Sequence, residues 1–298
     1  MRSLGGFPFP KLFPLMADSR GHGLLDGKHG VIFGALNPES LAWHVATAAH
    51  REGAGSAYSN APVAQRFGQL DELAEMTGGG PVVYADATKD EELREVFEKA
   101  KEAYGGKLDY VVHAIGMGLN VRKKKAYDEL NYDWYHKTLD ISAVSLHRVV
   151  RAALDVDALN DGASIVTLSY IGAQRVFSEY SEMGDAKALL ESIVRSFGYR
   201  LGKKGIRINA VSQSPTRTTA GGGIKGFDAM FDFAEQLAPL GNADAASCAD
   251  YVVTLLSDLT RLVTMQTLFH DGGFSSMGIS DRTVELLADA LGYDQGEE

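Results

Sequence analysis

Residues 164–207 read SIVTLSYIGAQRVFSEYSEMGDAKALLESIVRSFGYRLGKKGIR. This stretch opens with an apolar run typical of a strand, which ends at Tyr170, and then crosses a loop into a long helical pattern that carries Tyr180 and Lys187. The two residues are seven positions apart. Because each helical residue advances about 100°, the pattern predicts that both side chains lie on one helix face. A phenol and an ammonium directed into one cleft can act as a proton donor and its electrostatic partner.

Apolar runs of strand type alternate with helical patterns on both sides of this stretch. The other strand-like runs are 28–33, 56–60, 81–85, 108–116, 207–212 and 263–269, and the helical patterns are 41–49, 91–103, 134–154 and 248–257. About seven strands that alternate with helices predict an α/β fold, a Rossmann-like doubly wound parallel sheet with helices on both faces.

The domain organisation follows from the absence of a linker between residues 28 and 278. We expect one dinucleotide-binding reductase domain over residues 23–280. Residues 1–22 are rich in Phe, Pro and Gly without the continuous apolar core of a secretory signal, so they predict a loosely packed leader, with Met16 as an alternative start. Residues 281–298 predict a short amphipathic helix and an acidic tail.

The composition narrows the function classes. Of the 298 residues, 45% are hydrophobic and 23% are charged, which is typical of a globular protein. A net charge of −10 argues against a nucleic-acid binder. No apolar run is long enough to cross a membrane. A single cysteine, Cys248, excludes an internal disulfide and a cysteine-cluster metal site, and no histidine pair has metal-ligand spacing, so no metal is expected. This cysteine usage fits a reducing cytoplasm.

The first strand-like run ends in a turn that could bind a phosphate. Gly34 follows the run and a helical pattern begins at Leu41, and this order opens dinucleotide-binding units. Only Gly34 of a full G-x-G-x-x-G is in place, and Ser40 stands where a later glycine is expected. Taken alone, the turn fits an ordinary strand-to-helix connection equally well.

The next strand ends supply further candidates for cofactor contacts. Asn60 stands where an acidic residue would bind the ribose of NAD or an arginine would bind a 2′-phosphate, so NADH is favoured over NADPH only weakly. Asp86 is placed to bond an adenine amine, and Gly116 lets backbone approach a flat cofactor. Each feature also fits a sheet core followed by a turn, and only their order favours a cofactor site.

Two predicted loops near the cleft can each be interpreted in two ways. Residues 122–125, RKKK, are by default a solvated loop, and the alternative is a docking site for an acidic carrier. Residues 220–226 include three consecutive glycines and predict either a mobile lid or an ordinary surface loop.

With these motifs in this order, the chain from about Leu25 to Gly278 resembles the enoyl-acyl-carrier-protein reductases of bacterial type II fatty-acid synthesis, a divergent branch of the short-chain dehydrogenase/reductase superfamily. Common members of the superfamily place the tyrosine four residues before the lysine, which here is Met183 and cannot donate a proton. The enoyl reductases use the spacing of Tyr180 and Lys187. Tyr170 occupies the place of the catalytic serine of the common dehydrogenases.

Other segments agree with the resemblance. Residues 34–42 resemble the family's stretched glycine turn, residues 113–116 its His-Ser-Ile-Gly and residues 214–218 its Gly-Pro-Ile-Arg-Thr. Lys225 matches a basic carrier-docking residue, whereas Asp228 and Ala229 do not. The cofactor-binding residues that the resemblance implies are Gly34, Ser40, Leu41, Asn60, Asp86, Ala87, Ala114, Ile115, Gly116, Lys187, Pro215, Thr216 and Thr218. The implied substrate and lid residues are Met183, Ala220, Ile224 and Lys225.

The resemblance implies reduction of a trans-2-enoyl thioester, carried on acyl carrier protein, by hydride transfer from NADH to its β-carbon, with NADPH as the alternative cofactor. Tyr180 would donate to the enolate oxygen, Lys187 would hold the nicotinamide ribose, and Tyr170 would line or gate the acyl pocket. It also implies a cytoplasmic homotetramer, closed partly by residues 271–273.

Three alternatives stay open at this point. The first is a reductase of ketones or 3-oxoacyl thioesters, against which Met183 argues. The second is a non-catalytic NAD(H)-sensing protein of the same fold. In the third, the two tyrosines and the lysine only pack a helix onto a sheet.

Overall fold

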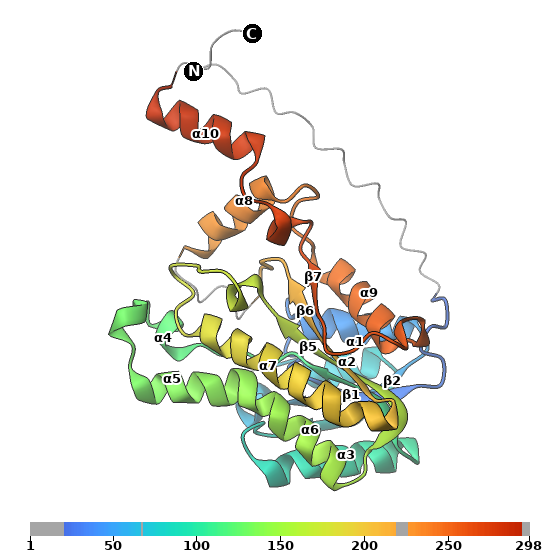
Figure 1. Cartoon of the computed structure of the whole chain (residues 1–298). Coiled ribbons are helices and arrows are strands. Elements are labelled where there is room, and N and C mark those ends of the chain that lie inside the picture. Colours follow the sequence, from blue (N-terminus) through green and yellow to red (C-terminus); the bar gives the residue numbers. More distant parts are fainter. Residues whose placement is uncertain (1–20, 67, 219–225, 294–298) are drawn as a thin grey trace.

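The computed structural model describes residues 21–66, 68–218 and 226–293. Its centre is one sheet of seven strands in the order β3-β2-β1-β4-β5-β6-β7, and every neighbouring pair is parallel (Figure 1). The strands are β1 (His29–Phe33), β2 (Gly55–Asn60), β3 (Val82–Tyr84), β4 (Leu108–His113), β5 (Leu159–Ser169), β6 (Arg207–Gln213) and β7 (Thr267–His270). The predicted doubly wound parallel sheet is confirmed.

Helices cover both faces of this sheet (Figure 1). The α-helices of the described residues are α1 (Leu41–Arg51), α2 (Leu70–Met76), α3 (Asp90–Tyr104), α4 (Leu119–Arg122), α5 (Tyr132–Leu139), α6 (Ser145–Asp155), α7 (Met183–Leu201), α8 (Phe227–Leu237), α9 (Ala245–Leu256) and α10 (Asp281–Leu291). Successive side chains of a strand point to opposite faces. Val31 and Phe33 of β1 therefore pack in the core formed with α3, α6 and α7, whereas Ile32 packs in the core formed with α1, α2 and α9.

The helix predicted over residues 134–154 is interrupted. A π-helical turn, Asp140–Val144, separates α5 from α6. Such turns are rare in proteins, and many of those that occur lie at functional sites. Within this turn, Ser142 Oγ accepts a hydrogen bond from Met117 N at 2.9 Å and donates one to Met117 O at 3.1 Å. The interruption thus ties the helix to the segment that follows β4.

The strand predicted over residues 263–269 begins four residues late. Met265 has a φ of 64°, in the left-handed region that ends an extended run, and its amide donates to Ile208 O at 2.8 Å. Regular pairing with β6 starts only at Thr267. The beginning of the predicted strand is therefore wrong, and its end is correct to within one residue.

A third apolar cluster lies outside the two sheet cores, where the chain leaves the carboxyl ends of β5 and β7. Its buried members are Val121, Tyr170, Ile171, Tyr180, Met183, Ala234, Leu237, Ala238 and Phe274, and Phe177 and Met277 pack against it. We call this set the aromatic cluster. Helix α8 lies over this end of the sheet, and α10 packs on α8 and projects from the body (Figure 1).

Across the described residues, no helix combines the length and the apolar composition that a membrane span requires.

Candidate active site

Tyr180 lies in a turn and not on a helix. Helix α7 begins at Met183, and the turn before it is closed by hydrogen bonds from Tyr180 N to Phe177 O at 3.0 Å and from Met183 N to Tyr180 O at 3.1 Å. Ser181 has a φ of 45°, which costs a residue with a side chain about 1–2 kcal/mol. The predicted shared helix face of Tyr180 and Lys187 is therefore wrong, although both residues lie near the carboxyl end of β5.

The rings of Tyr170 and Tyr180 pack against each other. Their centroids are 5.1 Å apart and their planes meet at 62°, an edge-on arrangement. Gly172 makes room for this pair, because a Cβ there would lie 2.6 Å from Tyr180 Cδ1. Burial raises the pKa of both phenols above the ordinary value of tyrosine. Both phenols therefore stay protonated at neutral pH and can donate a hydrogen bond.

Lys187 brings a buried ammonium to the carboxyl ends of β4 and β5. Its Nζ donates to Leu168 O at 2.8 Å. A Cβ on Gly116 would lie 3.8 Å from this Nζ and 3.9 Å from Met183 Cε, so the backbone after β4 runs directly past the ammonium. Burial lowers the pKa of Lys187 to about 8, against the opposing effect of the Glu191 carboxylate. The site thus holds a cation whose charge is sensitive to moderately alkaline pH.

We expect kcat/KM for NADH to fall as pH rises above about 8, because Lys187 loses its proton there. Stability should move the other way at this residue. Its folded pKa of about 8 lies below the ordinary 10.5, so the unfolded chain binds more protons between these values and unfolding becomes less favourable as pH rises. Profiles of kcat/KM and of melting temperature against pH separate the two effects. A flat kcat/KM profile between pH 7 and about 9 would contradict a role for the Lys187 charge in NADH binding.

Two buried polar residues beside Lys187 were not predicted from the sequence. Glu191 accepts hydrogen bonds from Ser169 Oγ at 2.7 Å and from Gln174 Nε2 at 3.2 Å. His113 is bonded through its two ring nitrogens to Thr167 Oγ1 and Ser145 Oγ, each at 2.9 Å. Burial, followed by the charge of Lys187, lowers the pKa of His113 to about 3, so its ring stays neutral. From the sequence, His113 was identified only as part of the match to His-Ser-Ile-Gly, without a role of its own. A glutamate one turn after a lysine is a common pattern, and nothing local distinguished Glu191.

The turn after β1 fits the phosphates of a dinucleotide. Gly34 has a φ of 94°, and a Cβ there would lie 2.3 Å from Ala114 O, so only glycine fits. Ser40 Oγ accepts from Leu36 N at 3.2 Å and donates to Asn37 O at 2.7 Å, which fixes the turn. Helix α1 starts at Leu41 with no acidic residue in its first turn, so its free N–H groups can receive an anion.

Gly34→Ala is expected to lower the free energy of unfolding by about 2 kcal/mol or more, through the left-handed backbone and the overlap with Ala114 O. NADH affinity should fall with it. Gly105→Ala is the matched control, because Gly105 also has a positive φ of 68° but has nothing within 4 Å of the position that a Cβ would take. Denaturant titration should give a loss of about 1 kcal/mol for the control, with NADH affinity unchanged. Equal losses of stability and of NADH affinity in both variants would contradict the proposed fit of the Gly34 turn to the dinucleotide phosphates.

The side chains of Asn60 and Asp86 bond to their own neighbourhood. Asn60 Nδ2 donates to Ala35 O at 2.7 Å and its Oδ1 accepts from Ala61 N at 2.7 Å, so its amide braces the glycine turn. Asp86 Oδ1 accepts from Thr88 N at 2.9 Å and from Thr88 Oγ1 at 2.8 Å. Both residues lie at the carboxyl edge of the sheet, at the ends of β2 and β3.

The remaining predicted cofactor residues lie along the same edge. Leu41, Ala87, Ala114 and Ile115 are partly buried against the two sheet cores. Pro215, Thr216 and Thr218 follow β6, and Thr216 Oγ1 donates to Ser214 O at 3.0 Å. Ala220, Ile224 and Lys225 lie outside the described residues, as does most of the glycine loop.

Apolar side chains from three segments pack against the tyrosine pair. Tyr170 OH contacts Met230 Sδ of α8 at 3.6 Å, and the Tyr170 and Phe177 rings lie 5.3 Å apart. The ring centroid of Phe274, from the segment after β7, lies 6.2 Å from that of Phe177. Phe177, Met230 and Phe274 were not predicted from the sequence, because they come from segments whose approach depends on the folded chain. The cluster suits an aliphatic chain beside the tyrosine hydroxyls.

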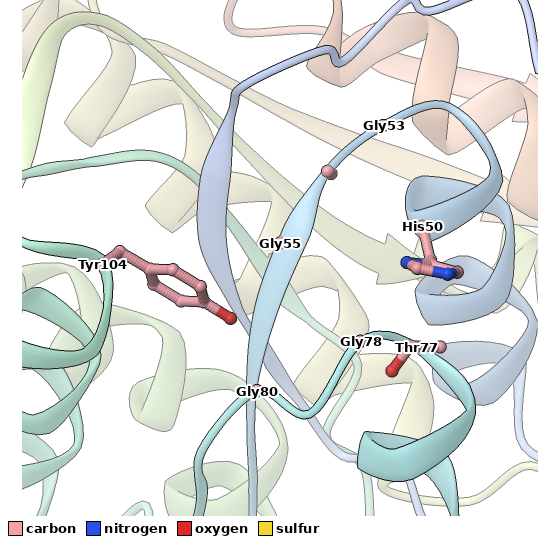
Figure 2. Close-up of a pocket in the computed structure, with 8 residues that line it drawn as sticks. His50, Gly53, Gly55, Thr77, Gly78, Gly80 and Tyr104 are labelled. Carbon is pink, nitrogen blue, oxygen red and sulfur yellow. The ribbon is translucent and has the colours of Figure 1, made fainter.

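A separate pocket opens at the other end of the sheet, around the first residue of β2 (Figure 2). It is lined by His50, Gly53, Ala54, Gly55, Thr77, Gly78, Gly80 and Tyr104. Tyr104 and His50 lie on opposite sides of β2 (Figure 2). None of the predicted site residues lines this pocket, so it is not part of the candidate active site.

Comparison with known proteins places these features in a family. Residues 34–275 match the family model described as enoyl-(acyl carrier protein) reductase. A relative from Aquifex aeolicus, enoyl-[acyl-carrier-protein] reductase [NADH] FabI, is 35% identical over 272 residues, which cover 91% of this chain and 99% of the relative.

Solved structures of enoyl-acyl-carrier-protein reductases are also similar to this chain. The FabI–NADH complex from Alistipes finegoldii is 54% identical, covers 93% of this chain and 95% of its own, and superimposes with a TM-score of 0.87. The Bacillus cereus enoyl-acyl carrier protein reductase, solved with NADP+ and indole naphthyridinone, is 35% identical, covers 86% of this chain and 99% of its own, and has a TM-score of 0.80.

Proposed function

The chain belongs to the enoyl-[acyl-carrier-protein] reductase family, and we propose that it carries out the reaction of an NADH-dependent enoyl reductase of fatty-acid synthesis with Tyr180, Lys187 and Tyr170. The observation that carries the residue assignment is that the packed tyrosine pair and the buried Lys187 ammonium both lie at the carboxyl end of β5 in a parallel sheet. Ligands of open α/β sheets bind at this end.

Tyr180 is the proposed hydrogen-bond donor in the reaction. NADH, when bound, supplies the hydride that adds to the β-carbon of a trans-2-enoyl thioester. The thioester oxygen then gains negative charge, and a donor already aimed at it lowers the barrier. The Tyr180 phenol suits this role because burial raises its pKa, so it keeps its proton until the enolate forms.

Lys187 is the proposed anchor of the nicotinamide ribose. Its ammonium has three N–H donors, one of which is used by Leu168 O. The other two are available for ribose hydroxyls where the backbone of Gly116 leaves space beside Nζ. The positive charge also favours the developing enolate. The glycine turn at Gly34 would hold the phosphates, with Asn60 and Asp86 along the same edge.

Tyr170 is the proposed lining of the acyl pocket. Its ring joins Tyr180 to the apolar side chains of α8 and of the segment after β7, so an acyl chain would lie against it. Met183 would form the wall on the Lys187 side, since its Cε lies near Gly116. We propose that Ala220, Ile224 and Lys225 complete this pocket as a lid.

NADH is the cofactor that we assign, with NADPH as the weaker alternative. Asn60 ends β2, at the position where a cation would pair with a 2′-phosphate. Asn60 carries no charge, and its amide is bonded to Ala35 O and Ala61 N. Crotonyl thioester assays with each cofactor test the preference. We expect kcat/KM to be higher with NADH.

The partner that we propose is acyl carrier protein, docked on residues 122–125. These four cationic side chains are exposed, and Arg122 closes α4, whose buried residue Asn120 contacts Glu182 next to the Tyr180 turn. An acidic carrier would be attracted to this surface. The net charge of −10 gives no comparable support for a nucleic-acid partner, and we propose no membrane partner.

We further propose a cytoplasmic homotetramer. Helix α10 exposes Val284, Leu286, Leu287 and Leu291, an apolar set that a second copy could cover. Residues 271–273, which follow β7, would form part of the same contact. In this arrangement residues 23–280 are the reductase domain, preceded by a leader over 1–22 and followed by the helix and tail over 281–298.

Isotope transfer tests the reaction. With NADH deuterated at both C4 positions and crotonyl thioester, we expect one deuterium at C3 of a saturated butyryl product. In deuterated water with ordinary NADH, the label should appear at C2. Formation of a hydroxyacyl product from a ketone substrate, without any saturated product from crotonyl thioester, would contradict the proposed reaction.

A further inference from the structure

Glu182 places a carboxylate in the interior, two residues after Tyr180. Its side chain is fully buried. Its Oε1 accepts hydrogen bonds from Asn120 N at 2.8 Å and from Thr138 Oγ1 at 3.0 Å. Its Oε2 is buried and has no hydrogen-bond partner within the described residues. A carboxylate is expensive to bury, and a single such group within a turn calls for a structural reason.

The two donors to Glu182 come from separate helices that are themselves joined. Asn120 belongs to α4 and is fully buried. The side-chain amide of Asn120 donates to Asn131 O at 3.1 Å and accepts from Asn131 N at 2.9 Å. The Asn131 side chain in turn caps α5 by accepting from Trp134 N at 3.0 Å. Thr138 lies on α5 and also accepts from Leu119 N at 3.1 Å. One carboxylate oxygen therefore fixes α4, α5 and the start of α7 to one another.

The same turn contains the unfavourable backbone of Ser181. Its φ of 45° is maintained only if the surrounding contacts impose it. Ser181 Oγ is buried without a partner among the described residues, so its side chain does not supply that constraint. Glu182 is the next residue, and its hydrogen bonds to two other helices tie this bend to the rest of the fold, in addition to the backbone bond from Met183 N to Tyr180 O that spans it.

We propose that Glu182 is a positioning residue, which fixes the Ser181 bend and thereby aims the Tyr180 phenol at the reacting thioester. Tyr180 directly precedes the bend, and from this backbone path its ring packs against Tyr170 and over Gly172. If the bend relaxed toward a regular helix, Tyr180 would be carried around the axis of α7 and away from Tyr170. This inference rests on the proposed role of Tyr180 as donor.

The test compares Glu182→Ala with Glu182→Gln. Glu182→Ala removes the acceptor, and we expect kcat on crotonyl thioester to fall about tenfold or more. KM for NADH should change less than about threefold, since the Gly34 turn and Lys187 are untouched. Glu182→Gln keeps an oxygen for Asn120 N and Thr138 Oγ1, and should restore kcat to within about threefold of the unchanged enzyme. Thr138→Val, which removes one donor at similar size, should lower kcat in the same direction and covers the case in which Glu182→Ala does not fold.

Asp185→Ala is the matched control. Asp185 Oδ2 accepts from Tyr127 OH at 2.9 Å and from Tyr135 OH at 3.2 Å, so it ties the same region to α7 one turn later, beyond the bend. We expect its kcat to stay within about twofold. An equal loss in Asp185→Ala and Glu182→Ala would show a general structural effect and overturn the positioning role.

A double-mutant cycle separates this inference from the proposed function. If Glu182 acts through Tyr180, Glu182→Ala should have little further effect on kcat in a Tyr180→Phe background. Additive losses would overturn the positioning role. A slow Tyr180→Phe with a normal Glu182→Ala would overturn the positioning role alone, whereas a fully active Tyr180→Phe would overturn the donor assignment and the positioning role with it.

Discussion

Tyr180→Phe is expected to lower kcat for crotonyl thioester reduction by about 100-fold, with KM for NADH within about threefold of the unchanged enzyme. Phenylalanine keeps the ring contact with Tyr170 at 5.1 Å and removes only the hydroxyl. The lost donor acts on the thioester oxygen only as charge develops there, so the loss should appear in kcat. Steady-state assays of NADH oxidation, with both substrates varied, measure it.

Tyr170→Phe is the matched control for this substitution. It removes the neighbouring hydroxyl, which contacts Met230 Sδ at 3.6 Å, while the ring pair is kept. We expect a loss of less than about tenfold, seen mainly as a higher KM for the acyl substrate. If Tyr170→Phe were the slower variant and Tyr180→Phe were near normal, the roles of the two tyrosines would have to be exchanged.

Lys187→Met is the second large effect, and we expect it to weaken NADH binding by about tenfold or more. Methionine fills most of the buried space of the lysine chain but lacks the ammonium that donates to Leu168 O. The donors proposed for the ribose hydroxyls are lost at the same time. Titration of NADH fluorescence measures the dissociation constant without turnover.

Lys101→Met controls for the loss of a lysine bonded to a backbone carbonyl. Lys101 lies on α3, away from the carboxyl edge of the sheet, and its Nζ donates to Val156 O at 2.7 Å. Its NADH affinity should match that of the unchanged enzyme. Unchanged NADH binding in Lys187→Met, with a normal fold by circular dichroism, would contradict the role of Lys187 as the cofactor anchor.

Much of the fold could be predicted from the sequence because local patterns and tertiary structure agree. The apolar runs around Val31, Val111 and Ile165 are buried on both faces, as strands in a parallel sheet are, and they alternate with amphipathic helical patterns. The position of Gly34 after the first apolar run predicted a turn, and its φ of 94° explains why glycine stands there.

The Tyr180 turn could not be predicted in this way. Residues 180–183, YSEM, are compatible with a helix, and nothing local signals a left-handed residue at Ser181. The bend depends on Asn120 and Thr138, which lie 62 and 44 positions from Glu182 in the chain. Contacts over such separations override local propensity, and they appear only when the helices are placed in space.

The aromatic residues that pack against the two tyrosines were missed for a related reason. Phe177 and Phe274 lie 6.2 Å apart but come from segments nearly one hundred positions apart, after β5 and after β7. Single aromatic residues in loops carry no periodic signal. Their meeting follows from the parallel sheet, which brings the carboxyl ends of its strands to one edge.

The most direct test of the account is the rate of NADH oxidation by the unchanged protein with crotonyl thioester and with acetoacetyl thioester, each presented on acyl carrier protein. A donor at Tyr180 and a methionine at position 183 predict reduction of the double bond and not of the ketone. We expect crotonyl thioester to be consumed at least about 100-fold faster than acetoacetyl thioester. Faster consumption of acetoacetyl thioester, or binding of NADH without turnover of either substrate, would contradict the proposed enoyl reduction.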